Sequence, residues 1–327
     1  MSTTVIVSGA TGFIAQHVVK SLLAKNYQVI GTVRSTTKGD HLLKLFNNPS
    51  NLSYEIVEDV GTQGAFDNVL KHHPEAKIFL HLASPFHFKA TNIEKELLEP
   101  AVNGTKNVLQ AIKDYGSGIQ KVVITSSYAA IGTASREADK SVVVTEDDWN
   151  AITWNEALEN PIAGYRGSKT FAEKAAWDFV KQNSADVKFT ISTVNPTFVF
   201  GPQAFEVGQE LNTSSEVINS ILKGSVPPTK GGWIDVRDVA KAHIIAFEKE
   251  EAVGKRLLLN AGRFNAGLLV KIIKEKYPQI ELPDVKEEVI SLATIDDSKT
   301  RKILGFDYYS LEQSVYDSVK QIIDARK

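Results

Sequence analysis

Three side chains in the middle of the chain have the types and spacing needed for proton transfer. Tyr165 and Lys169 are four residues apart where a helical pattern begins that continues through 170–182, so their side chains share one face. A tyrosine with the ordinary pKa of about 10 is a poor proton donor at neutral pH, and a nearby ammonium group lowers that pKa. Ser127 adds a hydroxyl donor. The set predicts general acid catalysis.

The Tyr-x-x-x-Lys spacing is common by chance, so its meaning depends on the elements around it. β-rich runs at 5–7, 28–33, 52–57, 77–82, 121–125 and 188–194 alternate with helical patterns. That order indicates parallel βαβ units and predicts an α/β protein with a Rossmann-type doubly wound parallel sheet. Run 121–125 leads into Ser127, which is then expected at the carboxyl edge of the sheet, where open α/β folds bind ligands.

A glycine-rich turn follows the first predicted strand. Gly9, Gly12 and Ala15 form a G-x-x-G-x-x-A pattern that leads into an amphipathic helix. Gly9 allows a tight turn, Gly12 lets backbone amides approach a pyrophosphate, and Ala15 allows close packing of the helix on the strand. Because the turn lies between a strand and a helix, it predicts a dinucleotide site in preference to a simple connection.

Basic residues after the second predicted strand favour NADPH/NADP+ over NAD. Arg34 stands where an NAD-selective protein usually carries an acidic residue, and Lys38 follows four residues later. Both cations suit a 2′-phosphate; the alternative is that both are solvated loop charges. Asp59 is expected either to contact adenine or to form a turn. The residues expected to bind the cofactor are Gly9, Thr11, Gly12, Phe13, Ile14, Arg34, Lys38, Asp59, Val60, Leu82, Ala83, Ser84, Thr125, Tyr165, Lys169, Pro196 and Val199.

The composition excludes several other classes of function. The 327 residues carry a net charge of −2, so no basic surplus favours nucleic acid or an anionic membrane. No run approaches the roughly 18 apolar residues that span a bilayer, and the N-terminal pattern is not that of a secretory signal, so we expect a cytoplasmic protein. The chain has no cysteine and no His-Glu-x-x-His pattern, and no metal site is predicted.

Two lobes are expected from the change of pattern after Asn195 and Pro196, where glycine, proline and polar residues interrupt the alternation. The NADP-binding Rossmann domain is predicted at 1–195 plus about 232–262. A smaller substrate-binding lobe is predicted at about 196–231 plus 263–327.

The motifs together resemble the extended short-chain dehydrogenases/reductases, in particular dihydroflavonol reductase-like enzymes. The runs that carry this resemblance are TGFIA, HLASP, TSSYAA, YRGSK, NPTFVFGPQ and IDVRDVAKAH. GATGFIAQHVV, PAVNGTKNVL and GSKTFAEKAAW are similar to the fungal NADPH-dependent methylglyoxal and 3-methylbutanal reductases. The resemblance implies a monomeric or homodimeric carbonyl reductase whose partner is a small-molecule carbonyl substrate.

The resemblance also assigns roles to the catalytic residues. Ser127 would bind the substrate carbonyl, Tyr165 would donate its proton, and Lys169 would hold the nicotinamide ribose. Asn103 would organise a proton relay, the alternative being an ordinary polar helix residue or cap. Gly132 stands where relatives carry a bulky aromatic residue, which predicts room for a larger ketone substituent.

Apolar and aromatic residues near these motifs are expected to form the substrate pocket. Phe86, Tyr128 and Ile162 are the main candidates, with a role in the core as the alternative for each. Two other functions are compatible with the motifs. One is a nucleotide-sugar epimerase or dehydratase, although segment 197–232 carries only Lys223 and Lys230 to hold a diphosphate. The other is a non-catalytic NADP sensor, which would not need the intact catalytic set.

Overall fold

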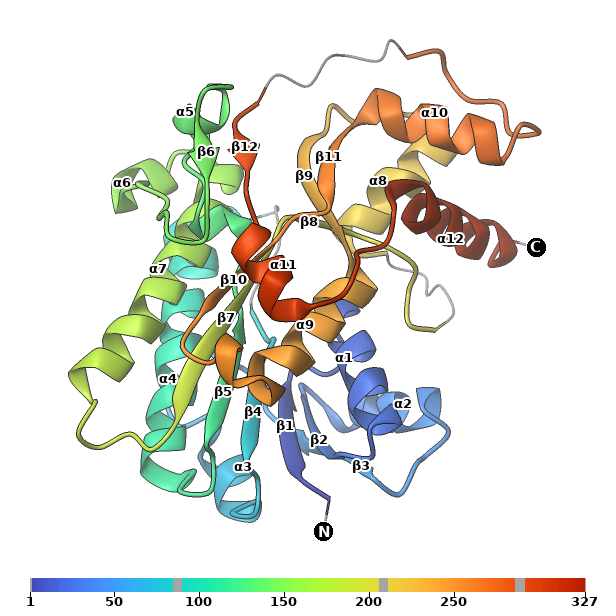
Figure 1. Cartoon of the computed structure of the whole chain (residues 1–327). Coiled ribbons are helices and arrows are strands. Elements are labelled where there is room, and N and C mark those ends of the chain that lie inside the picture. Colours follow the sequence, from blue (N-terminus) through green and yellow to red (C-terminus); the bar gives the residue numbers. More distant parts are fainter. Residues whose placement is uncertain (1, 85–89, 206–210, 286–291, 327) are drawn as a thin grey trace.

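A seven-stranded parallel sheet forms the centre of the larger part of the molecule (Figure 1). The structure is a computed structural model that describes residues 2–84, 90–205, 211–285 and 292–326. The strands are β1 (Thr4–Ser8), β2 (Gln28–Val33), β3 (Leu52–Ile56), β4 (Ile78–His81), β5 (Lys121–Thr125), β7 (Thr190–Pro196) and β10 (Arg256–Leu259). Their order, β10-β7-β5-β4-β1-β2-β3, and the parallel pairing of all neighbours confirm the predicted doubly wound fold.

Helices cover both faces of this sheet. Helices α1 (Phe13–Ala24) and α9 (Val236–Glu248) pack on one face, and α2 (Thr36–Leu45) joins the same core. Helices α3 (Asp67–His72), α4 (Glu99–Tyr115) and α7 (Pro161–Gln182) cover the other face. The strand order reverses between β1 and β4, so the helices that follow these two strands diverge and leave a crevice at the carboxyl edge.

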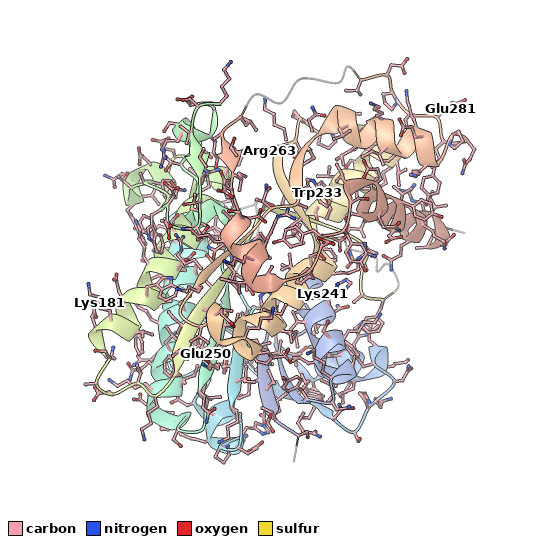
Figure 2. All side chains as sticks on the ribbon, in the orientation of Figure 1. Lys181, Trp233, Lys241, Glu250, Arg263 and Glu281 are labelled. Carbon is pink, nitrogen blue, oxygen red and sulfur yellow. The ribbon has the colours of Figure 1, made fainter. Side chains whose placement is uncertain are left out.

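A smaller lobe lies beyond the carboxyl ends of the strands (Figure 1). Strands β8 (Phe198–Phe200), β9 (Lys230–Asp235) and β11 (Gly262–Asn265) form its sheet, with helices α8 (Thr213–Leu222), α10 (Ala266–Lys276) and α12 (Leu311–Asp324) around it. Phe200, Trp233 and Phe264 fill its core, whereas charged side chains such as Lys181, Glu250 and Glu281 lie on the outside of the molecule (Figure 2). The predicted boundary at residue 232 falls within β9, and α11 (Ser298–Leu304) packs on the larger core through Leu304.

Short elements complete the described chain. They are α5 (Ala134–Glu137), α6 (Trp154–Ala157), the π-helix Glu94–Leu98, the 3-10 helices Tyr128–Ala130 and Glu250–Ala252, and the paired strands β6 (Val143–Val144) and β12 (Thr294–Ile295). Across the described ranges, no helix has both the length and the apolar character needed to cross a membrane.

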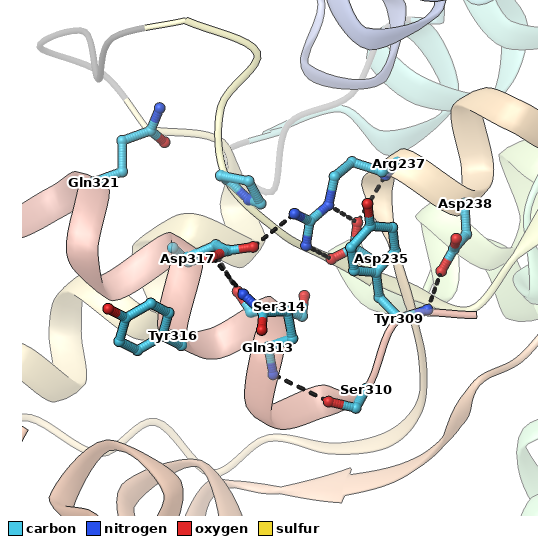
Figure 3. Close-up of polar contacts among 12 residues, drawn as sticks. Asp235, Arg237, Asp238, Tyr309, Ser310, Gln313, Ser314, Tyr316, Asp317 and Gln321 are labelled. Atoms are coloured by element: carbon cyan, nitrogen blue, oxygen red, sulfur yellow. Dashed lines mark hydrogen bonds and ion pairs between the residues drawn. The ribbon is translucent and has the colours of Figure 1, made fainter. Parts of the chain in front are cut away.

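A charged network joins α9 to the C-terminal helix (Figure 3). Arg237 donates from Nε and Nη2 to the two carboxylate oxygens of Asp235, at 2.8 and 2.9 Å, and from Nη1 to Asp317 of α12 at 2.6 Å. Its guanidinium carbon lies 3.7 Å from the ring centre of Tyr309. Asp238 accepts the backbone N–H of Tyr309 at 2.8 Å, and burial raises the pKa of Asp238 to about 6. These contacts fix the start of α12 against the larger domain.

Candidate active site

A cleft of about 330 Å³ opens at the carboxyl edge of the main sheet, where β1, β4 and β5 end. It is bordered on the other side by the start of the smaller lobe. The predicted residues that line it are Gly9, Gly12, Phe13, Ile14, Leu82, Ser84, Thr125, Ser127, Tyr165, Lys169, Pro196 and Val199. The structure therefore gathers the glycine turn, three strand ends and the catalytic candidates around one space.

Tyr165 and Ser127 are in hydrogen-bond contact within this cleft. The Oη of Tyr165 donates to the Oγ of Ser127 at 3.2 Å. Ser127 follows the end of β5 and caps the short 3-10 helix by accepting the N–H of Ala129 at 3.1 Å. Helix α7 begins at Pro161 with Asn160 as its cap, so Tyr165 lies in the second turn and Lys169 one turn later.

Burial dominates the electrostatics of these groups and corrects one expectation. Burial raises the pKa of Tyr165, while the hydroxyl of Ser127 and the charge of Arg166 lower it. The net direction is upward, opposite to the lowering by Lys169 that the spacing suggested. Burial also lowers the pKa of Lys169 to about 8, against the opposing charge of Glu173. Burial, and then the charge of Lys169, lower the pKa of His81 to about 3, so this imidazole is neutral.

The glycine turn has the shape that a dinucleotide phosphate requires. Gly9 has a φ of 65°, and a Cβ there would lie 3.0 Å from the Cα of Ala83. Helix α1 begins at Phe13 with Gly12 as its cap; no described side chain caps it and its first turn carries no acidic residue. Its N–H groups and positive dipole end suit a pyrophosphate, so these residues fit the predicted cofactor.

The basic pair predicted for the 2′-phosphate lies at the start of α2. Arg34 directly follows β2 and is exposed, and Lys38 is exposed in the first turn of α2. Ser35 caps this helix by accepting the backbone N–H of Lys38 at 3.4 Å. Two cations at a helix N-terminus give an environment suited to a phosphate group.

Asn103 lies outside the cleft, so the structure does not bring it together with the other predicted catalytic residues. Helix α4 turns Ala101, Gly104, Thr105 and Val108 inward, whereas Asn103 is exposed and borders a separate surface hollow. The small and apolar residues at 101, 104, 105 and 108 mark the buried face of the helix, a sequence signal that argues against Asn103. Thr105 is the hydroxyl residue of α4 that faces the catalytic region.

Other predicted residues also lie outside the main cleft. Asp59 accepts the backbone N–H of Gly61 at 2.8 Å and lies 3.4 Å from the hydroxyl of Thr62, so it forms a turn, as the alternative interpretation held. Thr11 is half-buried within the glycine turn and is not among the residues that border the cleft. Val60 and Ala83 border a chamber of about 20 Å³ behind Lys169.

The substrate candidates are distributed differently from the prediction. Ile162 is 67% exposed at the start of α7, and Phe86 lies outside the described residues. Tyr128 packs against Gly132, where an added Cβ would lie 2.6 Å from the Cζ of the tyrosine. The space beside Gly132 is therefore filled by Tyr128 and by Glu137, and it does not enlarge the pocket there.

The sequence did not indicate that the smaller lobe contributes Phe198, Asn212, Thr213 and Ser214 to the cleft. Helix α8 begins at Thr213 with Asn212 as its cap, and the polar run there is typical of a helix start. Nothing in that local pattern shows which part of the molecule the helix start faces.

Comparison with known proteins agrees with this geometry. The model of the NAD dependent epimerase/dehydratase family matches residues 5–266. The chain is 52% identical to the putative NADPH-dependent methylglyoxal reductase GRP2 of Candida albicans, over 98% of this chain and 99% of that protein. It is 69% identical to Gre2 of Candida albicans, solved in complex with NADPH, with a TM-score of 0.97 over 99% of this chain and 100% of that one. The yeast methylglyoxal/isovaleraldehyde reductase Gre2, complexed with NADPH, is 43% identical with a TM-score of 0.96, over 99% of both chains. This chain thus belongs to the NAD dependent epimerase/dehydratase family.

Proposed function

We propose that this protein is an NADPH-dependent carbonyl reductase that converts small aldehydes and ketones, including methylglyoxal and 3-methylbutanal, to alcohols. The observation that carries the proposal is the 3.2 Å contact between the Oη of Tyr165 and the Oγ of Ser127 in the cleft that also holds Lys169 and the glycine turn. Two relatives, GRP2 and GRE2, bear the name NADPH-dependent methylglyoxal reductase, in the case of GRP2 as putative. These names support the same substrate class.

The proposed chemistry divides one reduction between cofactor and protein. NADPH, when bound, supplies the hydride that forms the new C–H bond. Ser127 and Tyr165 hydrogen-bond the carbonyl oxygen, and as negative charge develops there the O–H bond of Tyr165 breaks and its proton passes to that oxygen. The raised pKa of Tyr165 keeps the phenol protonated at neutral pH. Lys169 stabilises the phenolate until it regains a proton from solvent.

The remaining residues set the choice of cofactor and substrate. Arg34 and Lys38 would hold the 2′-phosphate at the start of α2. Phe198 and the start of α8 would border the substrate, since they line the cleft from the smaller lobe. The lobes predicted from the sequence would then act as a cofactor domain and a substrate lobe, in a cytoplasmic monomer or homodimer.

Oxidation of NADPH and of NADH against one carbonyl panel tests this function. The panel contains methylglyoxal, 3-methylbutanal, a β-keto ester, an aryl ketone and a dihydroflavonol. We expect turnover with NADPH, slower turnover with NADH, and no change of melting temperature with UDP- or GDP-sugars. Tight NADPH binding without turnover of any carbonyl would favour a sensor, and stabilisation by a nucleotide sugar would favour an epimerase or dehydratase.

A further inference from the structure

A buried carboxylate lies directly behind the catalytic residues and has no role in the reaction described above. Glu173 is on α7, one turn after Lys169, and is 1% exposed. Its Oε1 accepts from Nε of Arg256 on β10 at 2.5 Å and from Nε1 of Trp177 at 3.3 Å. Its Oε2 accepts from Nδ2 of Asn195 at 2.6 Å and from the hydroxyl of Ser126. Both oxygens of this buried carboxylate are thus paired with hydrogen-bond donors.

Arg256 is fixed as firmly as the carboxylate that it neutralises. Its Nη1 donates to the backbone carbonyls of Glu146 at 2.8 Å and Asp148 at 2.5 Å. Its guanidinium carbon lies 3.7 Å from the ring centre of Trp149. The Glu173–Arg256 pair is therefore held by contacts on both members, which suits residues that position their neighbours.

Three hydrogen bonds connect this pair to the strand end that carries Ser127. Glu173 binds the side chain of Ser126, and the same Nδ2 of Asn195 that binds Glu173 also donates to the backbone carbonyl of Ser127 at 3.2 Å. The backbone N–H of Ser126 donates to Val194 of β7 at 2.8 Å. The backbone of Ser127 is thus fixed by Asn195, while its hydroxyl contacts Tyr165.

The carboxylate also faces Lys169. Both side chains border the 20 Å³ chamber, together with His81 of β4, Thr105 of α4 and the hydroxyl residues at the end of β5. Tyr165 precedes Lys169 on α7, and Arg256 contacts Glu173 through its Nε. Of these groups His81 is neutral, and Glu173 is the one that raises the pKa of Lys169 against burial. An opposite charge within about 4–6 Å generally shifts a pKa by about 1–3 units.

We propose that Glu173 is a positioning residue of this active site, which holds the end of β5 beneath Ser127 and keeps Lys169 an ammonium ion. This inference rests on the proposed reductase function for its catalytic meaning, but the charge of Lys169 can be measured without turnover.

The experiment compares Glu173→Gln with the wild-type protein. The first measurement is an NMR titration of ¹³C-labelled lysine side chains, with the Lys169 signal assigned by its absence in Lys169→Met. We expect the pKa of Lys169, about 8 in the wild type, to fall by about one unit in Glu173→Gln. The second is kcat against pH with NADPH and the best carbonyl of the panel. The pH above which kcat falls should move down by the same amount. Loss of the ammonium form alone should then reduce kcat about twofold at pH 7 and about tenfold at pH 9.

Matched variants separate charge from shape. Trp177→Phe removes one hydrogen bond to the same carboxylate without changing its charge, and should leave both the pKa and the pH profile in place. Glu173→Asp keeps the charge. In this variant the pH above which kcat falls should return toward the wild-type value, even if kcat itself is lower. If Glu173→Gln does not fold, Glu173→Asp still tests the proposal, because the pKa of Lys169 in Glu173→Asp should stay near the wild-type value. Ser126→Ala should lower kcat without changing the pH above which kcat falls.

The outcomes are distinct from those for the reductase function itself. An unchanged Lys169 pKa in Glu173→Gln, or a Glu173→Asp protein in which that pKa falls as if the charge were gone, would overturn the proposal. Loss of kcat by the same factor at every pH would reduce Glu173 to a structural role, which also overturns it. A wild-type protein without carbonyl turnover would remove the proposed function, while the NMR titration would still decide the charge of Lys169.

Discussion

The Oη of Tyr165 lies 3.2 Å from the Oγ of Ser127, although 38 residues separate them in the chain. Tyr165 comes from the second turn of α7, and Ser127 from just beyond the end of β5. Because both hydroxyls face one cleft, one carbonyl oxygen between them can accept hydrogen bonds from both.

Replacement of Tyr165 by Phe should abolish most turnover and leave cofactor affinity almost unchanged. The phenol is the proposed proton source, and general acid catalysis contributes about 10²–10⁴-fold to a rate. We expect kcat to fall by about that factor in Tyr165→Phe. In Ser127→Ala we expect kcat to fall by about 10²-fold, because one hydrogen bond to the oxygen remains. Stopped-flow kinetics and NADPH fluorescence titration measure the two quantities. Tyr316→Phe, on the exposed side of α12, is the control; a near wild-type kcat in Tyr165→Phe would remove its role as the acid.

Reversal of charge at Arg34 should change the preferred cofactor. Arg34→Asp removes a cation from the predicted 2′-phosphate site and adds an acceptor for ribose hydroxyls. The kcat/KM for NADPH should fall about 10- to 100-fold, the cost of one charge-assisted hydrogen bond, while that for NADH is kept or improved. Lys302→Asp, an equal charge change at an exposed position of α11, should leave the ratio unaltered. Equal losses with both cofactors would disprove the assignment of Arg34.

The turn at Gly9 should not accept even a methyl group. Gly9→Ala imposes an unfavourable positive φ and brings its Cβ to 3.0 Å from the Cα of Ala83. We expect a loss of stability of about 1–3 kcal/mol and a clear rise in the Kd for NADPH. Gly224→Ala is a matched control, because its φ is 84° but its Cβ meets nothing within 4 Å among the described residues. It should lower the melting temperature and leave the Kd for NADPH unchanged.

Asp238 makes the junction between α9 and the loop before α12 sensitive to pH. Burial raises its pKa to about 6, with a further rise from Asp235, while the Tyr309 N–H, Lys241 and Arg237 act in the lowering direction. A carboxyl whose pKa is raised in the folded state binds its proton more tightly there than in the unfolded chain. The free energy of unfolding therefore decreases as pH rises from about 4 to about 6.

Asp238→Asn should remove this effect, since an amide oxygen can still accept the N–H of Tyr309. The variant should be more stable than the wild type at pH 8, by at most about 3 kcal/mol, and gain little or nothing at pH 4. Urea unfolding at the two pH values measures the difference. An equal change at both values would show that the carboxyl does not titrate in this range.

Local patterns in the sequence were sufficient for the sheet, the glycine turn and the Tyr165–Lys169 pair. Strand period, helix period and the need for glycine in a tight turn depend on neighbours within a few residues, so they can be read along the chain. The spacing of Tyr165 and Lys169 places both on one helix face wherever that helix packs. Such features were predicted at the correct positions.

Only the tertiary structure decided which way side chains face and what lies behind them. Asn103 was placed in the site by its motif, but packing of α4 through Ala101, Thr105 and Val108 turns it to solvent. Tyr128 adjoins Ser127 in sequence yet packs against Gly132. The net pKa shift of Tyr165 depends on burial, and the contact of Glu173 with Arg256 spans 83 residues. Each of these depends on surfaces that meet only when distant segments pack together, and no local period encodes that meeting.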